Sequence, residues 1–314
     1  GIIGIGIGLG IIGMGHKNHM MALLGFSGAI MHIFNHSFFK SLLFYATGSI
    51  YRETHTRNME SLGGLIKKMP YTGTAFLIGS LAICGLPPFN GFISEYLIYW
   101  GFFKGLGSSG LFSSILFIGG IIFLSVIGGL ALLAFTKTFG IVFLGNARSK
   151  ACDHAKEVSK DMLLSKLLPV VFIVIIGLLP LIFVVPAGNI AGNLFHINTE
   201  IYFNSQMLMN LNYISMIGGI FILLVTGLLI VRKQFEKNKT ISYGPTWGCG
   251  YTAGNAKHQY TSTSFAHDYI QIVKPIFGVK RKTKIFQKED IFPKTREFET
   301  LHHDKTKKIL IDLP

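Results

Sequence analysis

Stretches without charged side chains divide most of the chain into segments long enough to cross a membrane. A spanning helix needs roughly 20 predominantly apolar residues and must satisfy its backbone hydrogen bonds within itself. Allowing a helix to continue through an isolated Lys or Glu, the pattern predicts six spans, of which the first is truncated: residues 1–15, 20–51, 71–103, 111–145, 166–186 and 207–231. The expected fold is therefore an all-α, polytopic transmembrane helical bundle.

The third of these spans contains a segment that cannot remain helical. Residues 86–91 read Leu-Pro-Pro-Phe-Asn-Gly, and successive prolines remove backbone donors and disfavour the helical conformation in the residue before each. We expect the helix to be broken at Pro87-Pro88 within the membrane, where protein or a water-filled cavity must cover the freed backbone groups. A proline kink is the alternative.

Composition and the placement of charge agree with a membrane protein. The 314 residues are 50% hydrophobic and 14% charged, with a mean hydropathy of +0.49, whereas soluble domains carry about 25% charged residues. These values exclude a water-soluble enzyme. Of the 29 Lys and Arg, 13 lie in residues 1–231 and 16 in residues 232–314. This division predicts a transmembrane region over 1–231 and a basic tail over 232–314.

Lys and Arg also predict the orientation of the spans. They are concentrated in the connections 51–70 and 146–166 and at the start of the tail, which all fall on one side of the predicted topology. Because cytoplasmic loops carry an excess of Lys and Arg, we expect these connections and the tail in the cytoplasm and the protein in the cell (inner) membrane. The net charge of +14 therefore serves orientation, and we expect no nucleic-acid partner.

Several common kinds of site are not indicated. The three cysteines, Cys84, Cys152 and Cys249, have neither metal-ligand nor disulfide-framework spacing. Residues 8–13 fit a dinucleotide-binding glycine pattern without the strand-turn-helix context that such a site needs, so close helix packing explains them better. We expect no catalytic residue, no bound cofactor and no metal site in this chain.

One predicted span carries three ionisable side chains along a single face. His32, His36 and Lys40 lie at i, i+4 and i+8, so they follow one another turn by turn; we call them the polar row. An ionisable side chain in mid-bilayer costs about 2.5–3.5 kcal/mol on insertion scales and so indicates a function. Since imidazole can both accept and donate a proton and a buried lysine can release one, the row predicts a proton relay. The alternative is a structural hydrogen-bond cluster in which Lys40 extends toward the interface.

Glu95 and Lys137 are two further candidates for the same relay. Glu95 lies one turn into the second half of the broken helix, and broken helices with a titratable group at the break are typical of ion-coupled transporters. Lys137 lies about two turns from the cytoplasmic end of its span, where it would be an entry or exit step. The alternatives are a structural pairing of Glu95 with a neighbouring Lys or His, and a Lys137 that extends to the interface.

The segments that contain these residues resemble a known family. Residues 32–44 (HIFNHSFFKSLLF), 63–65 (GGL) and 84–95 (CGLPPFNGFISE) resemble the antiporter-like, proton-conducting subunits of respiratory complex I and of the related Mrp antiporters. Residues 86–95, together with 246–251 (TWGCGY) and 259–265 (QYTSTSF), are similar to the branch that contains hydrogenase-4 component B and formate hydrogenlyase subunit 3. The resemblance covers residues 1–278.

The resemblance implies a fold of two inverted repeats, each with one broken helix, in which buried charges move protons, or sodium, while a cytoplasmic arm performs redox chemistry. His32, His36 and Lys40 would be the central relay of the second repeat, and Glu95 would be the terminal acid on its broken helix. The first repeat has no counterpart in these residues. We therefore expect the chain to be the C-terminal fragment of a longer protein.

These observations predict a proton-translocating membrane subunit of a group 4 hydrogenase or NADH:quinone oxidoreductase (complex I)-like complex. The subunit would belong to an oxidoreductase without carrying out the redox reaction itself. Expected partners are other membrane subunits, redox-arm subunits with iron-sulfur clusters, and the lipid bilayer. One alternative is a subunit of a multisubunit Na+/H+ antiporter, which needs no redox partner. Another is a structural subunit that conducts no ions.

Overall fold

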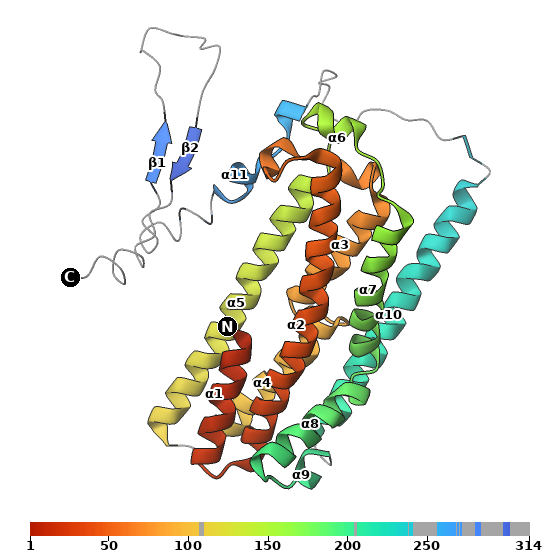
Figure 1. Cartoon of the computed structure of the whole chain (residues 1–314). Helices are drawn as coiled ribbons and strands as arrows, with labels where there is room; N and C mark the ends of the chain where they lie inside the picture. The colour runs from red at the N-terminus through yellow and green to blue at the C-terminus, as the bar shows by residue number, and fades with distance from the viewer. Residues whose placement is uncertain are drawn as a thin grey trace. The chain divides into compact units, whose positions relative to one another are not determined.

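The computed structural model describes residues 1–106, 110–203, 206–237, 239–240, 256–267, 269, 271, 280–283 and 298–301. The chain divides into two compact units, Gly1–Lys257 and His258–Pro314. The first unit is a helical bundle (Figure 1) whose elements are α1 (Ile2–Gly15), α2 (His19–Thr54), η1 (Met59–Ser61), η2 (Leu65–Lys67), α3 (Pro70–Ile83), α4 (Asn90–Leu106), α5 (Leu111–Phe143), α6 (Lys150–His154), α7 (Lys160–Leu178), α8 (Leu181–Phe195), α9 (Glu200–Phe203) and α10 (Gln206–Glu236).

These helices confirm the all-α transmembrane fold that the hydrophobic pattern predicts. Within the described ranges, α5, α7 and α10 are long and apolar enough to cross a membrane, and α1, α3 and α8 are shorter apolar helices. α2 has 36 residues and carries the polar row along its length. The predicted division into a transmembrane region and a cytoplasmic tail at residue 231 concerns the membrane itself and stays a prediction.

The third predicted span is broken where the two prolines stand. α3 ends at Ile83 and α4 begins at Asn90. Gly85 adopts a left-handed conformation with φ of 65°, and the next amide, that of Leu86, donates to the Leu81 carbonyl at 3.2 Å. This is the usual way for a helix to end, because glycine has no Cβ to oppose the left-handed conformation.

The fifth predicted span, residues 166–186, is wrong in its bounds. α7 begins six residues earlier, at Lys160, and ends at Leu178, and a separate helix, α8, continues to Phe195. Leu179 leaves the helical conformation with φ of −124° and ψ of 56°, because the proline that follows it disfavours the α region. The span is therefore a pair of helices that meet at Pro180.

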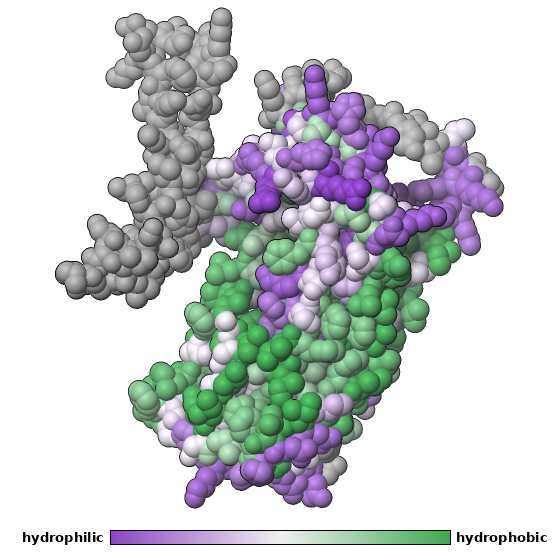
Figure 2. Space-filling view, in the orientation of Figure 1, coloured by the Kyte–Doolittle hydropathy of each residue, from purple (hydrophilic) through white to green (hydrophobic). Residues whose placement is uncertain are grey.

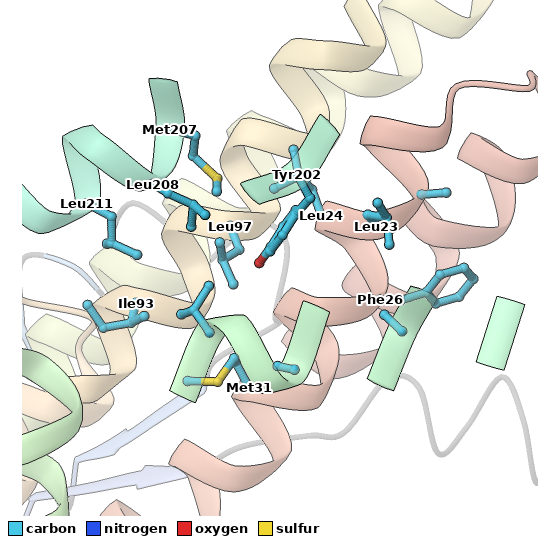
Figure 3. Close-up of a cluster of buried hydrophobic side chains, with 14 of the residues drawn as sticks. Leu23, Leu24, Phe26, Met31, Ile93, Leu97, Tyr202, Met207, Leu208 and Leu211 are labelled. Carbon is cyan, nitrogen blue, oxygen red and sulfur yellow. The ribbon is translucent and has the colours of Figure 1, made fainter. Parts of the chain in front are cut away.

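α2 lies at the centre of the bundle and packs against α1, α3, α4, α7 and α8 (Figure 1). The largest group of buried apolar side chains joins its first half to α4, α9 and α10. Figure 3 shows Leu24 and Met31 of α2 near Leu97 of α4, with Tyr202 of α9 and Leu208 of α10 completing the cluster. The polar row therefore lies on the central helix of the bundle.

The connections rich in Lys and Arg come together at one end of the bundle, as the alternation of loops predicts. Residues 55–69, which include η1 and η2, pack with α6 and the end of α5 in a second apolar cluster. The backbone needs Gly63 and Gly64 here: a Cβ on Gly63 would lie 2.5 Å from the Asn146 carbonyl oxygen, and Gly64 has φ of 68°. The glycines thus allow the two connections to touch, and Arg148 and Glu60 approach to 3.8 Å across the contact.

The outer surface of the first unit is apolar over its middle and hydrophilic at its ends (Figure 2). α5 and α10 contribute most to it, since only 11% and 6% of the residues in their most apolar 18-residue stretches are buried. Large side chains such as Phe112 and Leu223 are 75% and 72% exposed. A surface of this kind needs lipid or another apolar partner.

The second unit is described only in short pieces. Thr261 and Ser264 cap α11 (Ser262–Phe265) reciprocally. β1 (Lys280–Thr283) and β2 (Phe298–Leu301) form a two-stranded antiparallel sheet with Lys280 opposite Leu301, which the sequence pattern did not predict. Cys249 and the motif 246–251 lie outside the described residues, as does most of the stretch from 279 onward.

Candidate functional site

The polar row follows one face of α2, as its spacing predicts. His32 is buried, with 5% of its surface exposed, while His36 and Lys40 are half-buried. The ring centroids of His32 and His36 are 6.1 Å apart. Phe39 packs edge-on against both imidazoles, at 6.1 Å and 5.3 Å, and shields this side of the pair from water.

Ser94 of α4 links His32 to the broken helix. Its Oγ lies 2.9 Å from His32 Nδ1 and donates its own hydrogen to the Gly91 carbonyl at 3.0 Å. With the Ser94 hydrogen directed to Gly91, which leaves the hydroxyl no hydrogen for the ring, His32 Nδ1 is the donor in the first contact. The neutral ring then carries its lone pair on Nε2, which leaves that nitrogen able to accept a proton.

Two buried asparagines fasten the start of α4 to α2. Asn35 Nδ2 donates to the Asn90 carbonyl at 2.7 Å and to Ser94 Oγ at 3.2 Å. Asn90 Nδ2 in turn donates to Asn35 Oδ1 at 3.3 Å. Both asparagines are fully buried, where unpaired amides would be costly. The network therefore holds the helix that begins after the break in register with the polar row.

Glu95 lies in the second turn of α4, and its carboxylate reaches Gly85 in the break. Its side chain is 8% exposed, and a Cβ on Gly85 would lie 2.6 Å from its Oε2. Ser94 and Glu95 are neighbours in a helix, so their side chains diverge by about 100°, and only Ser94 faces His32. In the described part of the chain no hydrogen bond or ion pair involves the Glu95 carboxylate, so the structural pairing with a Lys or His is not formed there.

Lys137 lies in the last two turns of α5, as expected, and is half-buried. No hydrogen bond or ion pair to it occurs among the residues that the structure describes. The structure thus brings His32 and His36 together, keeps Lys40 on the same face, and leaves Glu95 and Lys137 apart from them. The role of all five in a relay stays a prediction.

Lys166 is a buried lysine that was predicted to end the basic connection 146–166. It lies in the second turn of α7 and is 2% exposed, and its Nζ donates to Ser49 of α2 and Thr72 of α3. A signal for its burial is present in the sequence, because Pro169, Ile173 and Ile176 continue a stripe of buried positions from Lys166 at spacings of three and four. Its charge and the adjoining polar connection obscure that stripe.

Within the described residues, no group of three or more His, Cys, Asp or Glu side chains could hold a metal ion. Cys84 and Cys152 are both buried free thiols. The expectation that this chain binds no cofactor and no metal stays a prediction.

Residues 7–122 match the family model described as NADH:quinone oxidoreductase/Mrp antiporter, transmembrane. Hydrogenase-4 component B of Escherichia coli (strain K12) is 32% identical over 276 residues, which cover 82% of this chain and 39% of that protein. Formate hydrogenlyase subunit 3 of the same organism is 33% identical over 288 residues, with 88% and 44% covered. The Na(+)/H(+) antiporter subunit A1 of Staphylococcus saprophyticus is 34% identical over 188 residues, with 57% and 23% covered. The chain spans less than half the length of these relatives.

Proposed function

Because the chain belongs to the antiporter-like family of membrane subunits, with residues 7–122 carrying the family's transmembrane segment, we propose that it moves protons along the polar row. The proposal rests above all on one observation. His32 is buried, forms a hydrogen bond through Nδ1 with Ser94 of the broken helix and faces His36 one turn away. An imidazole held in one tautomer with its other nitrogen free is prepared to accept a proton.

Proton transfer along the row uses the two nitrogens of each ring. A centroid distance of 6.1 Å between His32 and His36 is within reach of a hydrogen bond through one water molecule. Lys40 continues the row one turn beyond His36 and supplies an ammonium that can give up a proton. Each step moves a proton between neighbouring side chains of α2, so no backbone rearrangement of this helix is needed.

The broken helix provides the element that can control this transfer. Ser94 and Glu95 are adjacent in α4 but face the polar row and the break, respectively. A change in the protonation or pairing of Glu95 therefore acts on the helix that holds the His32 tautomer. We assign Glu95 the role of a control group for the row rather than of its next station, and Lys137 that of a station nearer the end of α5.

The names of two relatives support a proposal for the complex. Two of them are named for hydrogenase-4 and formate hydrogenlyase and align with more than four fifths of the chain. We propose that the chain works with other membrane subunits and with redox-arm subunits that carry iron-sulfur clusters, in the cell membrane with its basic end in the cytoplasm. Electron transfer in the redox arm would drive proton movement here.

Reconstitution of the complete complex into liposomes tests this function. With electron donor supplied, the Lys40→Ala and Glu95→Gln double variant should assemble and transfer electrons, while its proton flux falls to the level of liposomes without the complex. Lys17→Ala is the matched control, since Lys17 is exposed in the turn between α1 and α2. Proton pumping by the double variant at the normal ratio to electron flow would contradict the proposal.

The similarity to a Na(+)/H(+) antiporter subunit A1 supports a second candidate, a subunit of a multisubunit Na+/H+ antiporter. The two candidates differ in what co-purifies with the native protein. Nickel, iron and hydrogenase or dehydrogenase subunits favour the first, while membrane subunits alone, together with proton flux that requires a sodium gradient, favour the second.

A further inference from the structure

A buried polar cluster separate from the polar row joins α2, α3 and α7 near the basic end of the bundle. Its centre is Lys166, whose Nζ lies 2.7 Å from Ser49 Oγ and 2.8 Å from Thr72 Oγ1. Thr72 Oγ1 lies 2.6 Å from Glu157 Oε1. We call Lys166, Ser49, Thr72 and Glu157 the lysine cluster. An amine in this position has been taken out of water and depends on these partners.

In the lysine cluster, Lys166 Nζ donates to two hydroxyls, and each hydroxyl donates its own hydrogen to a further acceptor. Glu157 is acceptor-only when ionised, so Thr72 donates its single hydroxyl hydrogen to it. Ser49 likewise donates to the Tyr45 carbonyl at 2.9 Å. Both hydroxyls must therefore accept from Lys166 Nζ. A neutral amine has two hydrogens and an ammonium three, so the two acceptors suit either state.

Glu157 connects this cluster to the outside of the bundle. It is half-buried in the connection before α7, and its Oε2 accepts from the Tyr71 and Thr72 amides at 2.8 Å and 3.2 Å. These amides belong to the first turn of α3, where the helix dipole favours a negative charge. The carboxylate is thus held in place while part of its surface remains open to water.

We propose that Lys166, Thr72 and Glu157 form a proton-transfer path between water at the basic end of the bundle and the polar row, an inference that rests on the proposed function. In the outward step an N–H bond of Lys166 breaks as Thr72 Oγ1 takes that proton, and the former Thr72 hydroxyl proton bonds to Glu157 Oε1. Lys166 becomes a neutral amine and Glu157 a carboxylic acid, which then releases its proton to water. The inward step is the reverse.

The other end of the path leads along α2. Ser49 is about 13 Å from Lys40 along the helix, at 1.5 Å per residue. A groove of about 880 Å³ between α2 and α7 covers part of this interval, and Ser41, Tyr45, Ser165 and Asp161 give it polar groups. Ser41 is next to Lys40, and Tyr45 is one turn before Ser49, so these hydroxyls lie on the stretch of α2 that water molecules would follow between Lys40 and the lysine cluster.

Substitutions at Lys166 separate proton transfer from structural support. Lys166→Arg keeps a charge and the hydrogen-bond donors but cannot release a proton, and Lys166→Met removes the amine while keeping an unbranched chain. In the reconstituted complex both should lower proton flux by about a hundredfold, the lower end of what a positioned proton-transfer group contributes. Lys160→Met is the control: Lys160 is an exposed lysine of the same helix, and its removal should leave flux unchanged.

If the Lys166 variants fail to assemble, Thr72→Val tests the path instead. It keeps Lys166 and Glu157 and removes only the hydroxyl that connects them. Its flux should fall as in the Lys166 variants. Wild-type flux in an assembled Lys166→Arg or Thr72→Val complex would overturn the path and leave the cluster a structural role. If the Lys40→Ala and Glu95→Gln double variant stops proton movement while these variants do not, this inference alone is wrong. If the double variant pumps normally, the proposed function itself is wrong.

Discussion

At the scale of single residues, the role of each ionisable side chain depends on what faces it. His32 and His36 have the same chemistry and lie one turn apart, yet only His32 meets a hydroxyl of α4. Glu95 is next to that hydroxyl in sequence and still faces Gly85 instead of the histidine. The residue types and their spacing predicted the candidates, while the partner of each was decided by the neighbouring helix.

Ser94→Ala tests the contact that fixes the His32 tautomer. It removes the contacts of Oγ with His32, Asn35 and the Gly91 carbonyl, so it should cost about 1–3 kcal/mol of stability and should lower proton flux because Nδ1 loses its partner. Proton flux per turnover in proteoliposomes and the thermal unfolding temperature in detergent measure the two effects. Ser125→Ala on the exposed face of α5 also removes a hydrogen bond between two helices, that with Tyr99, but should leave proton flux unchanged. Unchanged flux in Ser94→Ala would remove Ser94 from the mechanism.

At the scale of elements, the broken helix is held by packing as well as by its own sequence. Two glycines allow neighbouring helices to touch the break: a Cβ on Gly177 of α7 would collide with the Pro88 carbonyl, and a Cβ on Gly218 of α10 with the Pro88 ring. Both prolines are readable in the sequence, but the need for glycine on two distant helices is not. The break is therefore covered by protein, as freed backbone groups in a membrane require.

Gly218→Ala should loosen α10 from the break. The added methyl has no space against Pro88, and overpacking of this kind costs about 1–3 kcal/mol. A lower unfolding temperature and faster proteolysis of the connection before α10 are the expected results. Gly227→Ala in the same helix is the matched control, because a Cβ at Gly227 meets nothing within 4 Å. Equal stability of the two variants would show that α10 does not pack on Pro88.

At the scale of the whole molecule, the distribution of charge gives the bundle a basic end and a weakly charged end. The connections 55–69 and 144–159 lie together at the first. The turn between α1 and α2 lies at the second, beside the end of α4, where Asn18 donates to the Lys104 carbonyl. The positive-inside rule then predicts that the first end faces the cytoplasm.

Labelling of single cysteines with a membrane-impermeant maleimide tests this orientation. The native cysteines are first replaced by alanine, and Arg57→Cys, Asp153→Cys and His19→Cys are introduced separately, at positions that are exposed. Inverted vesicles should label the first two and intact cells only the third. Labelling of Arg57→Cys and Asp153→Cys from opposite sides would contradict the topology, and labelling of both from outside would reverse the orientation.

The sequence by itself determined the spans, the break at Pro87-Pro88 and the face shared by His32, His36 and Lys40. These features depend on residues close together in the chain, through the length of apolar runs, the missing donor of proline and the helical repeat. It failed at α7, where residues 166–186 were predicted to be one continuous span through Pro180 and Lys166 was counted with the basic connection before it.

Only the tertiary structure decided which side chains meet. Ser94 is 62 residues from His32, and Lys166 is 117 residues from Ser49 and 94 from Thr72. No local pattern relates such positions, because the contact depends on how three helices are rotated against one another. That rotation is set by packing of their apolar stripes and glycines. The sequence therefore predicted which ionisable residues lie in the membrane spans. The tertiary structure showed which of them have hydrogen-bond partners and on which helices those partners lie.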